Sequence, residues 1–339
     1  MIRSPRAYRL LLLVLALALA LSCAASLGFG AAPVPLPSVL EILGHRLFEL
    51  QPAQAVSSAQ DSIVWLIRAP RVVLGALVGA GLALVGTALQ AVTRNPLADP
   101  HLLGVSSGAA LGAVIVVLYL GEFIGLLSLP LAAFVGALAS MLLVLAIASR
   151  GGRLESDRLL LAGVAVSFVM MAASNLLLFL GDHHAASSVI FWMLGGLGLA
   201  RWELLWLPAL CLALALLLLL GLARALNALM AGEHSAVSLG LEPRRVRLLV
   251  FVCASLLTGV LVSLSGAIGF VGLILPHVAR FLVGAEHRRL LPVSALLGAL
   301  FLVWVDVAAR TLLAPQDLPI GIATAAIGGV FFVLLLRRR

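Results

Sequence analysis

Long apolar segments recur along this chain, and they constrain its fold more than any other feature. Ten runs can be read from the sequence, at about 8–30, 70–92, 100–119, 124–148, 158–180, 203–223, 246–264, 271–284, 292–313 and 319–336. A helix of roughly twenty apolar residues spans the hydrocarbon core of a bilayer. The eighth run is short and contains Pro276. The predicted fold is all-α: a polytopic integral membrane protein with about ten transmembrane helices.

The low charge content excludes a soluble globular domain. Only 11% of the residues are charged, whereas soluble domains carry roughly 25%. The N-terminus could still be a signal peptide, because three arginines precede Leu10–Leu21 and the segment Ala20–Cys23 resembles a lipoprotein cleavage site. The apolar stretch continues to about Ala32, beyond the roughly 7–15 residues of a signal-peptide core. We therefore predict an uncleaved first transmembrane helix.

The arginines predict the orientation in the membrane. All 22 basic residues are Arg, and with the N-terminus inside 17 of them fall in cytoplasmic segments. The five predicted to lie outside are Arg46, Arg68, Arg71, Arg201 and Arg310. This bias matches the positive-inside rule and predicts a multi-pass protein of the bacterial inner membrane with both termini cytoplasmic. Because the arginines lie between apolar segments and not on one face, nucleic-acid binding is excluded.

An internal repeat indicates two related halves. A shift of 180 positions aligns Gly79 with Gly259, Leu84 with Leu264, Gly86 with Gly266 and Pro96 with Pro276. The shift places the second span on the seventh, an odd offset, so the repeat over spans 2–5 and 7–10 is predicted to be inverted. Inverted repeats with Gly- and Pro-broken helices are typical of transporters. The pattern predicts a translocation pathway between the halves.

The chain lacks the residues needed to energise transport. Without any lysine it cannot contain the phosphate-binding loop of an ATPase, so it is not predicted to be an enzyme. Ionisable residues in the spans are almost limited to Asp306 and Arg310, which share a helix face and are expected to pair. A partner is therefore the predicted energy source. A stand-alone secondary transporter or channel and a structural membrane scaffold remain the alternatives.

Three stretches carry a family resemblance. They are Arg68–Ala109, which begins RAPRVVLGALVGAG, Gly232–Leu241, which reads GEHSAVSLGL, and Ser265–Arg280, which reads SGAIGFVGLILPHVAR. Together they resemble the FecCD-type permeases, the membrane subunits of ABC importers for ferric siderophores, haem and vitamin B12. The resemblance implies one permease domain over 1–339 that works as a homodimer. It also implies two cytoplasmic subunits that bind ATP, a periplasmic substrate-binding protein, and no permanently bound cofactor.

The resemblance also implies two docking regions. Residues 232–243 would form the cytoplasmic coupling helices that contact the ATPase, with a simple connecting loop as the alternative. The coupling residues are Gly232, Glu233, His234, Ser235, Ala236, Leu239 and Gly240. Arg68, Arg71 and Arg310 would pair with acidic groups on the binding protein, since Arg binds carboxylates through two donors. Snorkelling to the interface, or pairing of Arg310 with Asp306, is the alternative.

The pathway and cargo depend on weaker features. Gly266, Gly269 and Pro276 are expected to break the eighth span and form part of a gate, and Val189–Leu199 is expected to be an interfacial or re-entrant helix. His183 and His184 lie in an external segment, where a neutral imidazole can ligate haem iron transiently, although such pairs usually occur in solvated loops. No permanent metal site is predicted. The predicted cargo is haem, with a ferric siderophore and cobalamin as alternatives.

Overall fold

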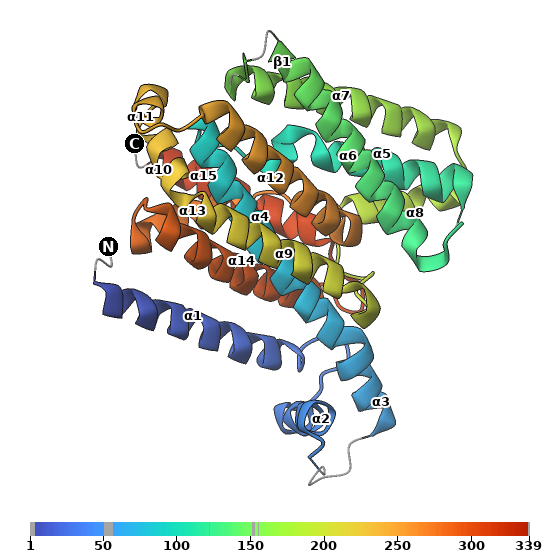
Figure 1. Cartoon of the computed structure of the whole chain (residues 1–339). Helices are drawn as coiled ribbons and strands as arrows, with labels where there is room; N and C mark the ends of the chain where they lie inside the picture. Colours follow the sequence, from blue (N-terminus) through green and yellow to red (C-terminus); the bar gives the residue numbers. More distant parts are fainter. Residues whose placement is uncertain (1–3, 51–56, 122, 151–152, 155, 338–339) are drawn as a thin grey trace.

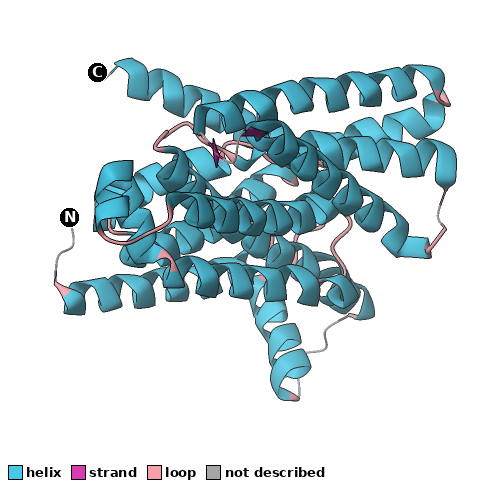
Figure 2. Ribbon diagram, turned by 45° about the horizontal axis from the view of Figure 1, so that its top comes forward, coloured by secondary structure: helices cyan, strands magenta, loops and turns pink. Residues whose placement is uncertain are grey.

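The computed structural model describes residues 4–50, 57–121, 123–150, 153–154 and 156–337. The regular secondary structure of these residues is helical apart from one short pair of strands. In it β1 (Ser149–Arg150) pairs antiparallel with β2 (Arg153–Leu154), as Figure 2 shows. The main helices are α1 (Pro5–Ser26), α2 (Leu36–Phe48), α3 (Ser58–Asp61), α4 (Ala69–Thr93), α5 (Val105–Ile115), α6 (Ser128–Ala148), α7 (Ser156–Leu180), α8 (His183–Met193), α9 (Trp206–Gly221), α10 (Ala223–Met230), α11 (Glu233–Ser238), α12 (Pro243–Ser265), α13 (Val271–Val283), α14 (His287–Ala309) and α15 (Ile320–Arg337).

The helices match the ten predicted spans. Among the described residues, seven helices are long and apolar enough to cross a membrane, and three shorter apolar helices are Val105–Leu120, Val271–Val283 and Ile320–Leu334. Each of these ten segments overlaps one predicted run, so the all-α membrane fold is confirmed. The start of α1, the end of α15 and α11 lie at one end of the bundle, here called the α11 end, and α2 marks the other (Figure 1).

α4 forms the centre of the bundle. The most apolar part of the helix that contains α4 is 83% buried, whereas that of α1 is 11% buried. α4 packs against α12, the helix with which the repeat aligns it, and against α13 and α14. At Gly79 a side chain would overlap the carbonyl of Gly298 on α14, so the two backbones approach as closely as glycine allows. The exposed leucines of α1, α6, α7 and α9 form the outer surface, which suits contact with lipid.

The outer segments differ from the sequence prediction in two ways. The second span starts at Ser58, because α3 continues through a π-helical segment (Ser62–Arg68) into α4, so the helix is 36 residues long. The loop before it contains α2, which was not predicted. α2 begins at Leu36, between Pro35 and Pro37, and ends before Glu49, whose left-handed backbone (φ 57°) stops the helix. In Figure 1 α2 is seen nearly end-on beside α1, which lies lengthwise.

Pro276 does not break the eighth span, contrary to the prediction. α13 continues through Pro276. A proline has no N–H to donate to the carbonyl four residues earlier, here that of Gly272, but this carbonyl accepts a hydrogen bond from another donor. Gln90 Nε2 on α4 donates to Gly272 O at 3.0 Å, and Gln90 Oε1 accepts from Arg280 Nη2 at 2.7 Å. The break lies earlier, at 266–270, where Gly266 (φ 63°) and Phe270 (φ 69°) adopt left-handed conformations.

Candidate functional site

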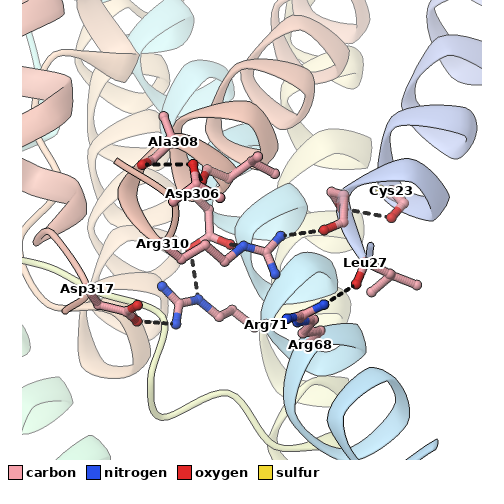
Figure 3. Close-up of polar contacts among 11 residues, drawn as sticks. Cys23, Leu27, Arg68, Arg71, Asp306, Ala308, Arg310 and Asp317 are labelled. Carbon is pink, nitrogen blue, oxygen red and sulfur yellow. Dashed lines mark hydrogen bonds and ion pairs between the residues drawn. The ribbon is translucent and has the colours of Figure 1, made fainter. Parts of the chain in front are cut away.

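Arg71 lies at the α2 end of the bundle and bridges two carboxylates. Its Nε is 2.8 Å from Asp306 Oδ1, and its Nη1 is 2.5 Å from Asp317 Oδ2 (Figure 3). Asp306 belongs to α14 and has a side chain 1% exposed, whereas Asp317 lies in the turn before α15 and is 44% exposed. Arg71 therefore joins a buried carboxylate to one that faces solvent.

Arg310 lies one turn after Asp306 and is buried. Its Nε is 3.3 Å from Asp306 Oδ2, which is consistent with the pairing within the helix that the sequence predicted. Its Nη2 donates to Ser26 O at 2.9 Å, and thus connects α14 to the end of α1. The contact of Nε with Asp306 is an ion pair without the geometry of a hydrogen bond, and Nη1 has no hydrogen-bond acceptor among the described residues. Arg310 thus connects the buried carboxylate of Asp306 to the end of α1.

Arg68 is also buried, and it faces a different partner from Arg71. Its Nη1 and Nη2 donate to Leu27 O at 2.8 Å and Ala32 O at 2.5 Å. Gly30 (φ 147°) lies against this guanidinium, where a Cβ would come too close. Arg68 lies well inside the helix that starts at Ser58, whereas the second span was predicted to begin at about residue 70. Arg68 holds the turn after α1.

These charged side chains form a cluster with a small net positive charge and little exposure to solvent. Its members are Arg68, Arg71, Asp306, Arg310 and Asp317. Three guanidinium groups and two carboxylates leave one net positive charge. Of the three arginines only Arg71 contacts an exposed acidic group, since Arg68 and Arg310 are 6% and 5% exposed. Contact between these arginines and a binding protein stays a prediction. The geometry favours Arg71 as the arginine that a partner can reach.

α11 forms a surface element at the opposite end. Gly232 (φ 123°) precedes it and Gly240 (φ 75°) follows it, and both conformations are ones that glycine adopts readily. Glu233, His234 and Ser235 are exposed, Leu239 is 70% exposed, and Ala236 is completely buried. The predicted coupling segment 232–243 thus contains one short helix that ends before α12 begins at Pro243.

Two contacts fix α11 and the helix before it to the bundle. Arg247 on α12 is 6% exposed, and its Nη2 is 3.1 Å from Glu233 Oε2. Asn227 Oδ1 on α10 accepts the backbone N–H of His287, the first residue of α14, at 3.0 Å. A force applied to α11 would therefore act on α12 directly and on α14 through α10.

Three helix ends meet where the gate was predicted. Gly196 N donates to Ser265 O at 2.8 Å, Ile320 N to Gly195 O at 2.9 Å, and Gly321 N to Leu194 O at 3.1 Å. These bonds join the residues after α8, the break after α12 and the start of α15. Non-helical backbone inside a membrane needs such internal partners. Gly266 lies in this junction, against Trp192 O, while Gly269 has no neighbour that a Cβ would meet.

The histidine pair lies at the start of α8. His183 and His184 are its first two residues, and their side chains lie outside the described residues, so their predicted role is untested. Val189–Leu199 was expected to be one short helix, but α8 ends at Met193 and the rest is irregular. No group of three or more metal-ligating residues occurs in the part of the chain that the structure describes.

Sequence reasoning missed three polar residues that connect elements: Asp317, Gln90 and Arg247. Asp317 follows the ninth predicted span, and no partner was assigned to it. Gln90 is a polar residue inside an apolar run, which is a signal that a buried partner exists. Arg247 was counted only as a cytoplasmic charge. In each case the partner is distant in sequence, by 246, 182 and 14 residues.

Comparisons with known proteins agree with this architecture. The model of the FecCD transport family matches residues 15–338. The hemin transport system permease protein of Yersinia pestis is 42% identical over 290 residues, covering 84% of this chain and 86% of that protein. The cobalamin import system permease protein of Halobacterium salinarum is 43% identical over 284 residues, covering 84% and 76%. The Fe(3+) dicitrate transport system permease protein of Escherichia coli is 42% identical, covering 82% and 84%.

Solved structures support the same assignment. An ABC transporter assigned to the metal-chelate type, solved in an inward-facing conformation, superposes with a TM-score of 0.82 at 32% identity, covering 98% of this chain and 100% of that one. PsaBC from Streptococcus pneumoniae, in complex with a Fab, has a TM-score of 0.53 at 19% identity, which reflects the fold alone. The chain belongs to the FecCD transport family and is a membrane permease component of an ABC importer.

Proposed function

We propose that this chain carries haem from the periplasm to the cytoplasm as a homodimer, driven by ATP hydrolysis in two cytoplasmic partner subunits. The observation in favour of haem is the alignment with the hemin permease, which covers 84% of this chain and 86% of that protein. The identities to the hemin and cobalamin permeases, 42% and 43%, are nearly equal. Cobalamin and a ferric siderophore are therefore the alternative cargoes, and the experiment compares all three.

Reconstituted uptake tests class and cargo together. Proteoliposomes would contain this chain with its ATP-binding subunit, and the binding protein would be added with haem, a ferric siderophore or cobalamin. Haem uptake that requires ATP is the expected result. ATP-dependent uptake of another cargo would replace haem and keep the importer. Uptake by the chain alone without ATP would instead indicate a secondary transporter.

We propose that α11 docks into the ATP-binding subunit. Val237 and Leu239 are 57% and 70% exposed in an otherwise polar segment, where large exposed apolar side chains indicate a protein contact. Leu239→Asp is expected to reduce association with the ATP-binding subunit tenfold or more, measured by pull-down from detergent. Leu97→Asp, on the loop after α4 and 53% exposed, is the matched control. Equal losses in both variants would contradict docking at α11.

The orientation in the membrane is also part of the proposal. The α11 end is placed in the cytoplasm, together with both termini, because 17 of the 22 arginines fall in the segments assigned there. Reporter fusions at the C-terminus test this placement. Alkaline phosphatase is expected to be inactive and green fluorescent protein fluorescent. The reverse pattern would invert the orientation.

We propose that the periplasmic binding protein docks at Arg71 through an acidic group. The cluster has a net positive charge, and Arg71 offers the planar donor geometry that carboxylates prefer. Arg68 and Arg310 support it by fixing the turn after α1. Arg71→Gln should weaken docking, and the loss should shrink as salt is raised, because exposed charges are screened.

A further inference from the structure

The two carboxylates that pair with Arg71 differ in how easily another anion can replace them. Asp306 is 1% exposed and lies between two guanidinium groups, whereas Asp317 is 44% exposed and, among the residues that the structure describes, pairs with Arg71 alone. A buried ion pair that loses one partner leaves an uncompensated charge, at a cost of several kcal/mol. An exposed ion pair contributes only about 0.2–1 kcal/mol. Solvent or another anion can therefore replace Asp317 but not Asp306.

The surrounding backbone lets Asp317 leave without any rearrangement. Leu318 N donates to Ala309 O at 2.9 Å, and Ile320 N donates to Gly195 O at 2.9 Å, so the turn is held independently of the ion pair. Rotation of the Asp317 side chain is enough to free the Nη1 atom of Arg71. Because Nε is already bound to Asp306, an incoming carboxylate that binds through two donors would use Nη1 together with Nη2.

We propose that Asp317 is an exchangeable counter-ion of Arg71, which an acidic group of the periplasmic binding protein displaces when it docks. The inference rests on the proposed docking at Arg71. Asp317 competes with the incoming carboxylate and therefore lowers the affinity for the binding protein. Weaker docking allows the binding protein to leave after each delivery. Asp317 also keeps Arg71 neutralised while the site is empty.

Affinity measurements on single and double variants test the inference. The complete transporter in lipid nanodiscs would be titrated with its periplasmic binding protein, and Kd would be measured by biolayer interferometry at low and physiological salt. Asp317→Asn should tighten Kd about 1.5- to fivefold, because it removes the competitor and keeps the shape of the side chain. Arg71→Gln should weaken Kd tenfold or more. Adding Asp317→Asn to Arg71→Gln should change nothing further.

A matched control separates competition from a general change in charge. Glu203 is exposed just before α9, and it makes no ion pair with Arg71, so Glu203→Gln removes one negative charge that is not paired with Arg71. This variant should leave Kd unchanged. Arg71→Gln is expected to fold, because Asp306 keeps Arg310 at 3.3 Å as its counter-ion. Thermal unfolding of each variant in nanodiscs verifies this.

The outcomes distinguish the exchange of Asp317 from the docking of the binding protein at Arg71, on which it rests. If Arg71→Gln weakens docking but Asp317→Asn leaves Kd unchanged or weakens it, docking at Arg71 stands and the exchange is refuted. If Asp317→Asn and Glu203→Gln tighten Kd equally, the effect is general electrostatics and the exchange is again refuted. If Arg71→Gln has no effect, docking at Arg71 fails and the inference fails with it.

Discussion

Gln90 offers a sharp test of how α13 tolerates its internal proline. The side chain is 2% exposed, donates to Gly272 O at 3.0 Å and accepts from Arg280 Nη2 at 2.7 Å. Residue 276 would donate to Gly272 O in an ordinary helix, but Pro276 has no N–H. Gln90→Leu keeps the bulk of the side chain and removes both hydrogen bonds. The carbonyl of Gly272 is then left without a donor in a buried position.

The loss can be estimated from the two contacts. A buried carbonyl without a partner costs about 1–3 kcal/mol, and a hydrogen bond to a charged group contributes about 1.5–3 kcal/mol. Arg280 is partly exposed and can turn toward water, so most of the second contribution is recovered. We expect a total loss of about 2–3 kcal/mol. At roughly 2 °C per kcal/mol, the unfolding midpoint should fall by about 4–6 °C.

Thermal unfolding in lipid nanodiscs, followed by tryptophan fluorescence, measures the shift. Thr93→Val is the control, because among the described residues this buried hydroxyl donates only to Leu89 O of its own helix, at 2.7 Å, and its loss should matter little. Pro276→Ala restores the helical N–H for Gly272 O. In that background Gln90→Leu should cost about 1 kcal/mol less. Equal losses with and without Pro276 would refute the view that Gln90 substitutes for the missing donor.

Three further predictions concern other parts of the molecule. Gly79→Val should lower the unfolding midpoint by more than about 5 °C, since its side chain would overlap a carbonyl of α14, whereas Gly221→Val, with open space around it, should not. Burial raises the pKa of Asp99, which lies in the loop after α4, so native protein holds its proton to higher pH than unfolded protein and loses stability as pH rises through that pKa. The midpoint of Asp99→Asn should therefore exceed that of wild type by more at pH 8 than at pH 4, and an equal difference at both pH values would contradict this. Arg68→Gln should speed hydrogen exchange in residues 27–34 about thirtyfold or more while α4 stays protected, because two charge-assisted bonds to that turn are lost.

Local sequence predicted the helices well because hydrophobicity along a span depends only on neighbouring residues. All ten apolar runs became helices, and the turn residues Asn95 and Asp99 accept backbone N–H groups of Leu97 and His101, as their chemistry suggests. The outer elements were less predictable. α2 is partly apolar and too short to span, so hydropathy alone gave no signal for it. The start of the second span was misplaced because Ser58 and Asp61 looked like loop residues.

The sequence by itself determined the class of the protein: a helical membrane permease of a family whose motifs it carries, without the lysine that a phosphate-binding loop needs. Only the tertiary structure decided which charges and polar groups meet. Asp317 and Arg71 are 246 residues apart, and Gln90 and Gly272 are 182 apart. Such pairs are set by how helices cross, and no local pattern encodes that crossing. Burial likewise distinguished Arg71 from Arg68, which the sequence treated as alike.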